Sequence, residues 1–279
     1  MTDIKIIKDW IDNADGIIIG AGAGLSDAAG IHYSGKKFEH DFAPWISKYH
    51  IKDLYTSSFY SFNTEEEKWA YWAKHIYYSY YERKHNDLYK KLYEFIKNKN
   101  YFVITTNTDG MFINNGFAKN KVFEVQGSYS KLQCLIPCHN KLYNNEDIVK
   151  EMLNNISDDL KIPSSLVPKC PKCGSKMVVN LRCDDTFVED DNWNLMEQEY
   201  NKFINSNKDK NIVLLEFGVG FNTPGIIRFP FEQLTYMFNN FKLIRFNDKY
   251  NTIPSEIKDK SIFIDDNIKE VIDKISNIN

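Results

Sequence analysis

The sequence has neither a strong net charge nor a long apolar run. Its 35 Lys and Arg residues are nearly balanced by 38 Asp and Glu residues, which leaves a net charge of −3. Nucleic-acid binding needs clustered positive charge, so nucleic acid is not expected as the main partner. No apolar run is long enough to span a bilayer, and the residues after Met1 contain no signal-peptide core. We therefore expect a cytoplasmic protein that does not bind membranes.

Cysteine is scarce, and all five cysteines fall between residues 130 and 190. In a reducing compartment they are expected to be thiols or metal ligands rather than disulfides. Internal repeats and low-complexity tracts are absent as well. What the sequence does have is a hydrophobic fraction of 43% over 279 residues. This is enough for one large domain with an inserted module, or for two domains.

A glycine-rich loop follows the first apolar run. Three isoleucines at 17–19 lead directly into GAGAG at 20–24 and then into LSDAA at 25–29, which is typical of a helix start. A strand that turns into a helix through glycines exposes backbone N–H groups at the positive end of the helix dipole, where a pyrophosphate can bind. The spacing does not match G-x-G-x-x-G in strict register, so a simple tight turn remains the alternative.

Short apolar runs predict six strands, at residues 16–20, 101–105, 122–125, 212–217, 242–247 and 261–264. Helical segments separate most of them, which predicts an α/β fold: a Rossmann-like parallel sheet with helices on both faces. Polar or glycine-rich loops follow four of the strands, at 20–26, 106–110, 126–128 and 218–222. Because the carboxyl ends of parallel strands line the ligand crevice, these loops should converge on one site.

Two cysteine pairs have the spacing of a metal site. Together, Cys134-x3-Cys138 and Cys170-x2-Cys173 could form a tetrahedral zinc site. The alternative is that they are free thiols. Cys183 or His139 could replace one of the four ligands. Four thiolates leave no open coordination position, so such a zinc would be structural.

Two segments interrupt the α/β pattern. Residues 36–96 carry aromatic residues at helical spacing, which indicates helices packed into a core or a lid over a ligand. Residues 128–190 contain the cysteines and four prolines. We therefore predict a helical insertion at 36–96, a zinc-binding insertion at 128–190, and a Rossmann-like nucleotide-binding domain built from 1–35, 97–127 and 191–279.

In this order the motifs resemble the sirtuin family of NAD-dependent enzymes. The loop at 22–26 followed by Gly30-Ile31 resembles the family's cofactor loop, TTNTD at 105–109 resembles T-Q-N-I-D, and GVG at 218–220 resembles G-T-S. FVE at 187–189 is similar to F-G-E, and the cysteine pairs follow in the expected order. The resemblance implies that NAD is bound as a substrate and that the small module binds zinc.

One departure from the family pattern bears directly on the reaction. Gln126-Gly127 stands where sirtuins have H-G, and that histidine is their general base for deacylation. A glutamine amide can hydrogen-bond to a ribose hydroxyl but cannot take its proton near neutral pH. In this respect the sequence resembles the macrodomain-linked class M sirtuins, which also have glutamine in place of this histidine. That branch implies an NAD-dependent protein mono-ADP-ribosyltransferase, a lipoylated glycine-cleavage-H-like carrier as acceptor, and a macrodomain hydrolase as partner.

The resemblance assigns roles to the loop residues. Asn107 and Asp109 would orient the nicotinamide end of NAD, and Gln126 would hold a ribose hydroxyl. The alternatives are that Asn107 and Asp109 only cap the next helix and that Gln126 has no role in the reaction. The expected NAD contacts are Gly22, Ala23, Gly24, Ser26, Thr106, Asn107, Asp109, Gln126, Gly218, Val219, Gly220 and Asn222. Two other functions stay open: a deacylase in which another residue, such as His32, replaces the base, and a non-catalytic NAD sensor or an NAD hydrolase.

Overall fold

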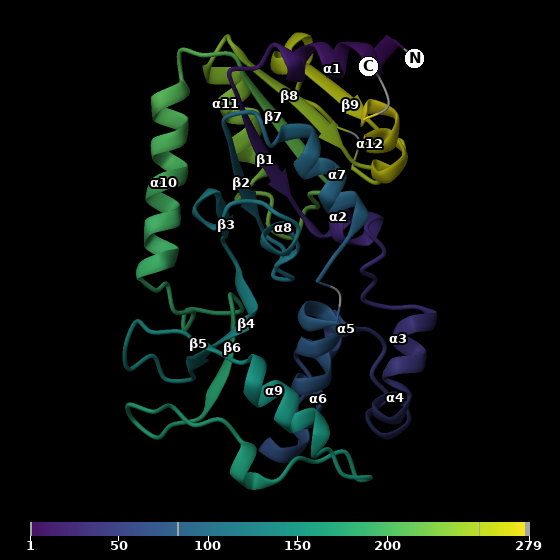
Figure 1. The fold of residues 1–279 in the computed structure, drawn as a ribbon, viewed down its shortest axis with the longest axis vertical. Coiled ribbons are helices and arrows are strands. Elements are labelled where there is room, and N and C mark those ends of the chain that lie inside the picture. The colour runs from purple at the N-terminus through teal and green to yellow at the C-terminus, as the bar shows by residue number, and fades with distance from the viewer. Residues whose placement is uncertain (1, 83, 251, 277–279) are drawn as a thin grey trace. The chain divides into compact units, whose positions relative to one another are not determined.

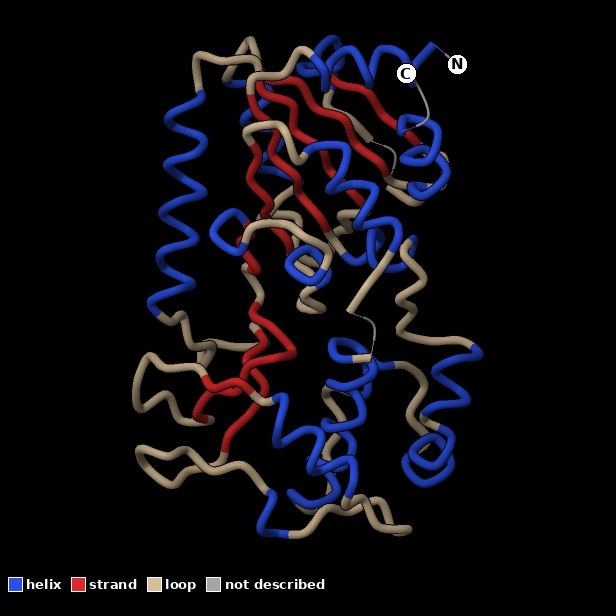
Figure 2. Tube along the Cα trace, in the orientation of Figure 1, coloured by secondary structure: helices blue, strands red, loops and turns tan. Residues whose placement is uncertain are grey.

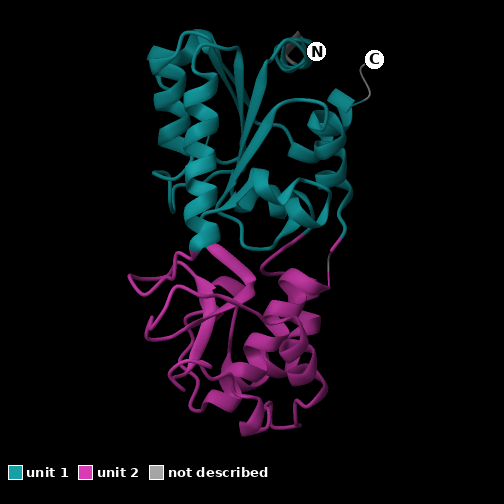
Figure 3. Cartoon of the chain, turned by 60° about the vertical axis from the view of Figure 1, so that its left-hand side comes forward, with its two compact units in different colours: residues 1–30, 85–126, 191–279 teal, residues 31–84, 127–190 magenta. Residues whose placement is uncertain are grey.

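The computed structural model describes residues 2–82, 84–250 and 252–276. The chain divides into two compact units, coloured separately in Figure 3. The first contains Met1–Gly30, His85–Gln126 and Asp191–Asn279, and the second contains Ile31–Lys84 and Gly127–Asp190. Residues 85–96, which the sequence analysis placed in the helical insertion, lie in the first unit, and both insertions contribute to a single second unit.

A six-stranded parallel sheet forms the centre of the first unit (Figures 1 and 2). Its order is β3 (Val122–Glu124), β2 (Tyr101–Thr105), β1 (Gly16–Ala21), β7 (Ile212–Phe217), β8 (Phe241–Phe246) and β9 (Ser261–Ile264). Ile18 of β1 lies opposite Phe102 on one side and Leu214 on the other. The strand order therefore reverses direction between β1 and β7. This arrangement confirms the predicted Rossmann-like sheet.

Helices cover both faces of this sheet. One layer contains α10 (Asp191–Asn207) and α11 (Arg228–Met237), whose apolar residues share a core with Ile18, Phe102 and Leu214. The other layer contains α1 (Thr2–Asp12), α2 (Ala23–Ala28), α7 (Asp87–Ile96) and α12 (Ile268–Ser276), which pack on one another. The remaining helix of this unit is the short α8 (Met111–Asn114). None of the described helices is long and apolar enough to span a bilayer.

Aromatic side chains form much of the core of the second unit. Its helices are α3 (Lys36–Asp41), α4 (Ala43–Tyr49), α5 (Leu54–Ser57), α6 (Glu65–Ile76), a π-helical turn at Tyr77–Tyr81, and α9 (Glu146–Asn154). Trp45, Trp69 and Tyr71 are buried in one cluster, whereas Phe59 remains exposed. Most of the aromatic residues therefore pack as a helical core, which is the first of the two alternatives drawn from their spacing.

A small antiparallel sheet completes the second unit. It has the order β5 (Tyr143–Asn144), β4 (Gly127–Cys134) and β6 (Met177–Leu181). Gly127 begins β4 with a φ of 88°, and a Cβ at this position would overlap the backbone carbonyl of Asn180. Only glycine fits both the backbone conformation and the close approach. The residue after Gln126 is therefore fixed as glycine by the fold.

Candidate functional site

The first unit brings two glycine-rich loops together at the switch point of its sheet. The backbone N–H of Gly24 donates to the carbonyl of Gly218 over 3.0 Å. Gly218 has a φ of 57°, and a Cβ added to Gly24 would lie 2.7 Å from the Gly218 Cα. Side chains are excluded on both sides, so the two loops pack backbone against backbone at the start of α2. A crevice at the switch point of a parallel sheet, beside a strand-to-helix turn, is where such folds bind nucleotides.

Asn107 connects the loop after β2 to the glycine loop after β1. Its side-chain Nδ2 donates to the carbonyl of Gly22 over 3.0 Å, and its backbone N–H donates to Thr105 Oγ1 over 3.0 Å. The side chain is buried. Asn107 therefore fixes the relative position of the two loops, which is more than the helix-capping role considered from the sequence.

Asp109 makes a second connection between the same loops. Its Oδ2 accepts a 2.6 Å hydrogen bond from Ser26 Oγ, and its Oδ1 accepts from the backbone N–H of Met111 over 3.1 Å. Burial raises the pKa of Asp109, while Ser26 and the Met111 N–H act in the opposite direction. Asp109 does cap α8 in this way, but one carboxylate oxygen is held by the glycine-loop helix. The Ser26 hydroxyl points inward to this carboxylate.

The other residues expected to contact NAD are less firmly connected to the glycine loop than Asn107 and Asp109. Thr106 donates its backbone N–H to Ala21 over 3.0 Å and so lies at the same edge of the sheet. Gln126 lies two residues after the end of β3 and is half-buried, next to Val125, whose N–H donates to the carbonyl of Thr105. Ala23 and Asn222 are exposed. Their roles toward NAD stay predictions.

Sequence reasoning missed Asn247, which directly follows β8 at the same edge of the sheet. Its Nδ2 donates to the carbonyl of Val219 over 2.8 Å, and its Oδ1 accepts from the backbone N–H of Tyr250 over 2.9 Å. It therefore holds the GVG loop against the loop after β8. A polar residue directly after a predicted strand is the pattern that indicated Asn107 and Asp109, and the same pattern indicates Asn247.

Sequence reasoning also missed a buried ion pair beneath the GVG loop. Arg245 on β8 donates from Nε and Nη2 to the two carboxylate oxygens of Glu216 on β7, each over 2.8 Å, and both residues are fully buried. Arg228 lies 3.7 Å from Glu216 and stacks on the Phe221 ring. Two parallel hydrogen bonds between guanidinium and carboxylate fix geometry strongly. They fix the two strands that carry this part of the crevice.

Four cysteines of the second unit form a cluster that fits a zinc ion. One ligand atom from each of Cys134, Cys138, Cys170 and Cys173 lies within 4.8 Å of the others. The Sγ atoms of Cys134 and Cys173 are 3.6 Å apart, and those of Cys138 and Cys170 are 3.7 Å apart. Zinc–thiolate bonds of about 2.3 Å in a tetrahedron put sulfur atoms about 3.8 Å apart. The three-residue spacing of the first pair is therefore compatible with a four-thiolate site.

Neither of the two replacement ligands considered from the sequence belongs to the cluster. His139 Nδ1 lies 3.0 Å from the Cys138 sulfur, and its Nε2 lies 2.8 Å from the Tyr143 hydroxyl. Cys183 is exposed. His139 is thus a neighbour that can orient the Cys138 thiolate.

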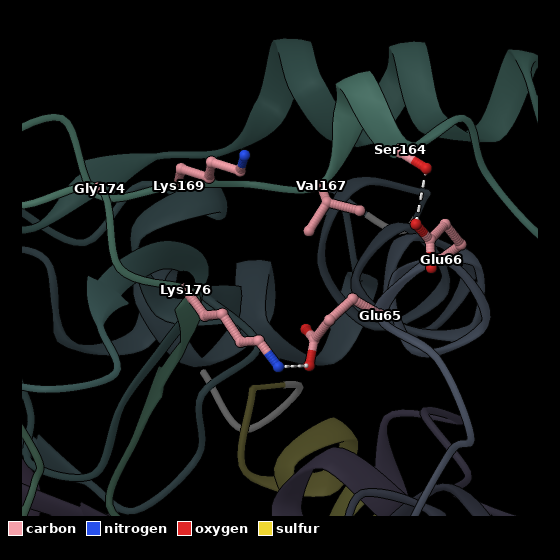
Figure 4. A pocket seen from close by; sticks show the side chains of 7 residues that line it. All are labelled: Glu65, Glu66, Ser164, Val167, Lys169, Gly174 and Lys176. Atoms are coloured by element: carbon pink, nitrogen blue, oxygen red, sulfur yellow. Dashed lines mark hydrogen bonds and ion pairs between the residues drawn. The ribbon is translucent and has the colours of Figure 1, made fainter.

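A surface pocket of the second unit has a different character (Figure 4). Lys176 Nζ donates to Glu65 Oε1 over 3.0 Å, and Ser164 Oγ donates to Glu66 Oε1 over 2.7 Å. Both glutamates of this pocket therefore have a hydrogen-bond partner within the protein. Its lining residues are Glu65, Glu66, Ser164, Val167, Lys169, Gly174 and Lys176.

The parallel sheet with its paired glycine loops, together with the four-cysteine module, is typical of a Rossmann-type nucleotide-binding protein with an inserted metal-site module. The chain belongs to the Sir2 family, whose model matches residues 22–216. This confirms the resemblance drawn from the motifs.

Two relatives share about a third of their residues with the chain. A "Protein ADP-ribosyltransferase" of Staphylococcus aureus (strain Mu50 / ATCC 700699) is 32% identical over 269 residues, which cover 96% of this chain and 85% of the relative. A "Probable bifunctional ADP-ribose hydrolase/ADP-ribosyltransferase" of Fusarium oxysporum f. sp. cubense is 32% identical over 259 residues. That match covers 87% of this chain but 42% of the fungal protein, which is therefore much longer.

Solved sirtuin structures share the fold at low sequence identity. One of them, from a study of the mechanism and regulation of Sir2 enzymes, has a TM-score of 0.58 and 19% identity. The match covers 99% of this chain and 97% of the solved chain. Another, a Sir2 homologue mutant in complex with ADP-ribose, has a TM-score of 0.57 and 14% identity, covering 98% and 94%. These similarities extend over both units.

Proposed function

We propose that the protein is an NAD-dependent protein mono-ADP-ribosyltransferase. It transfers ADP-ribose from NAD to an acceptor protein and releases nicotinamide. The observation that carries this proposal is the glutamine at position 126, two residues after β3 in a Sir2-family chain. The Staphylococcus aureus relative named a protein ADP-ribosyltransferase, which aligns with 96% of this chain, supports the same conclusion.

Glutamine at position 126 does not support deacylation but is compatible with transfer of ADP-ribose. Deacylation by sirtuins needs a base that takes a proton from the ribose, and the Gln126 amide cannot do so near neutral pH. Loss of a general base costs about 10²–10⁴-fold in rate. Direct transfer needs no base on the ribose. The acceptor nucleophile forms a bond to the anomeric carbon as the bond to nicotinamide breaks, and nicotinamide leaves as a neutral molecule.

The chain's own residues then serve to bind and orient NAD. The glycine loop at the start of α2 would hold the pyrophosphate, since neither Gly22 nor Gly24 carries a side chain that would keep a phosphate away. Asn107 and Asp109 would orient the nicotinamide end, and Gln126 would hold a ribose hydroxyl. Holding the reacting atoms in line supplies much of the rate in such a substitution. Zinc bound by the four cysteines would stabilise the β4–β6 sheet and take no part in the reaction.

The acceptor and partner are part of the proposal. The resemblance to the macrodomain-linked branch favours a lipoylated glycine-cleavage-H-like carrier as acceptor and a macrodomain hydrolase as partner. Support for a hydrolase comes from the fungal relative, whose name joins an ADP-ribose hydrolase with a transferase in one chain.

Incubation with NAD labelled in the adenine ring tests the function. Purified lipoylated and unlipoylated carrier serve as acceptors, and an acetylated peptide serves as the deacylase substrate. Label on the lipoylated carrier supports the full proposal, and equal label on both carriers removes the requirement for lipoylation. O-acyl-ADP-ribose would instead identify a deacylase, free ADP-ribose alone a hydrolase, and absence of turnover an NAD sensor.

The variant Gln126→Ala tests the residue that carries the proposal. We expect transfer to fall about 10-fold or more, because the ribose loses a hydrogen-bonding partner that fixes its orientation. Gln233→Ala is the control, since Gln233 is an exposed glutamine on α11. Transfer at the full rate by Gln126→Ala would show that the glutamine has no such role.

A further inference from the structure

Tyr89 is a buried tyrosine that reaches the candidate site from α7. Its side chain is 0% exposed, and its hydroxyl lies 3.3 Å from Ser26 Oγ. From the sequence alone Tyr89 is one of several aromatic residues at helical spacing in residues 36–96. A tyrosine hydroxyl buried in a helical core needs a hydrogen-bond partner, and this one finds its partner in the glycine-loop helix.

The direction of these hydrogen bonds follows from the hydrogens available. Ser26 has a single hydroxyl hydrogen and gives it to Asp109 Oδ2 over 2.6 Å. Toward Ser26 the Tyr89 hydroxyl must therefore be the donor, while a side-chain hydrogen bond from Asn107 also reaches the Tyr89 oxygen. Burial, and after it the Asp109 carboxylate, raises the pKa of Tyr89 well above its ordinary value, so the hydroxyl keeps its hydrogen. A directed chain results, from Tyr89 to Ser26 to Asp109.

The backbone of Tyr89 is itself fixed against both loops. Asn86 caps α7 with its Oδ1 and donates its Nδ2 to the carbonyl of Ala29, at the end of α2, over 2.8 Å. Asn115, at the end of α8, accepts the backbone N–H of Asn86 over 2.8 Å. The Tyr89 ring packs edge-on against Phe112 of α8, with ring centroids 5.0 Å apart. The hydroxyl is thus held from α2 and α8 at once.

We propose that Tyr89 is a positioning residue for cleavage of the nicotinamide–ribose bond: through Ser26 it fixes the Asp109 carboxylate, and with it the loop that carries Asn107. This inference rests on the proposed function, because it assumes that the loops after β1 and β2 orient NAD. It does not depend on the acceptor, because nicotinamide release is common to transfer and hydrolysis. Tyr89 itself need not touch NAD.

The test compares Tyr89→Phe with Tyr200→Phe. Both remove one buried tyrosine hydroxyl from the first unit, but the Tyr200 hydroxyl has no hydrogen-bond partner among the described residues. Nicotinamide release gives kcat and KM for NAD, and calorimetry gives the affinity for ADP-ribose. For Tyr89→Phe we expect kcat to fall about 5- to 30-fold, with KM and ADP-ribose affinity within about 2-fold of wild type. Tyr200→Phe should match wild type in all three.

A double-mutant cycle with Ser26→Ala separates positioning from a general loss of structure. If Tyr89 acts through Ser26, adding Tyr89→Phe to Ser26→Ala should lower kcat no further. Multiplicative losses, an unchanged kcat in Tyr89→Phe, or an equal loss of ADP-ribose binding would overturn the inference. Wild-type protein that releases no nicotinamide would instead overturn the proposed function. Active wild type with an equally active Tyr89→Phe would overturn only the role of Tyr89.

Discussion

Gly24 and Gly218 come so close together that neither can carry a side chain. A Cβ on Gly24 would lie 2.7 Å from the Gly218 Cα, and a Cβ on Gly218 would overlap the backbone of Gly24. The two residues belong to the loops after β1 and β7, the strands between which the sheet order reverses. This contact joins the two loops through backbone alone, at the edge of the sheet where parallel α/β folds bind nucleotides.

Alanine at position 24 should therefore weaken nucleotide binding. The added methyl group pushes the two loops apart, so we expect ADP-ribose affinity to fall about 10-fold or more and stability to fall by about 1–3 kcal/mol. Gly225→Ala is the matched control, because no atom lies within 4 Å of a Cβ at that position. Calorimetry and urea unfolding measure the two effects. Equal affinities in both variants would show that the crevice does not depend on this contact.

The cysteine cluster predicts a selective loss of metal. Cys170→Ser removes one of the four thiols that lie within 4.8 Å of one another. We expect purified Cys170→Ser to contain less than half of the zinc of wild type and to unfold at a lower temperature, since structural zinc contributes directly to folding. Cys183→Ser, which changes an exposed cysteine outside the cluster, should keep one zinc per chain. Equal metal content in both variants would contradict a four-thiolate site.

His75 predicts a loss of stability in mild acid. It is fully buried between the hydroxyls of Tyr71 and Tyr129, and burial lowers the pKa of His75 from 6.5 to about 3. The unfolded chain therefore binds a proton below pH 6.5 that the folded chain does not, so stability decreases as the pH falls below 6.5. Between pH 7 and pH 5 the expected loss is about 2 kcal/mol.

Urea unfolding at pH 7, 6 and 5 measures this contribution. His75→Gln cannot titrate, so its free energy of unfolding should change less with pH than that of wild type. His85→Gln replaces an exposed histidine and should keep the wild-type pH dependence. If His75→Gln shows the wild-type pH dependence too, another group is responsible for any acid sensitivity.

The strands and their loops could be predicted because both leave local signals. Apolar runs gave the strands, and polar residues or glycines directly after them located Asn107, Asp109 and Gly218. The Tyr89–Ser26 contact left no such signal, because the two residues are 63 positions apart and one lies in an ordinary amphipathic helix. The direction of the Ser26 hydroxyl likewise depends on packing between α2 and the loop before α8. Local sequence patterns carry no information about such contacts.

Glu216 shows the same limit in a strand. In the sequence Glu216 interrupts an apolar run. An exposed glutamate at the end of a strand would produce the same pattern, so the pattern does not predict burial. The structure buries it completely opposite Arg245, because β7 and β8 are neighbours in exact parallel register at this point. Its partner lies 29 positions away.

Breaking this pair should destabilise the protein strongly. Glu216→Gln leaves two buried guanidinium groups, those of Arg245 and Arg228, with the Glu232 carboxylate shared between them. One buried positive charge is then uncompensated, so we expect a loss of about 3–5 kcal/mol in the free energy of unfolding. The double variant Glu216→Gln/Arg245→Met removes both charges and should recover at least half of that loss. Lys202→Ala breaks an exposed pair with Glu199 and should cost less than about 1 kcal/mol. Urea unfolding at neutral pH measures all three, and a cost for Glu216→Gln as small as that of Lys202→Ala would show that the buried pair does not hold the two strands together.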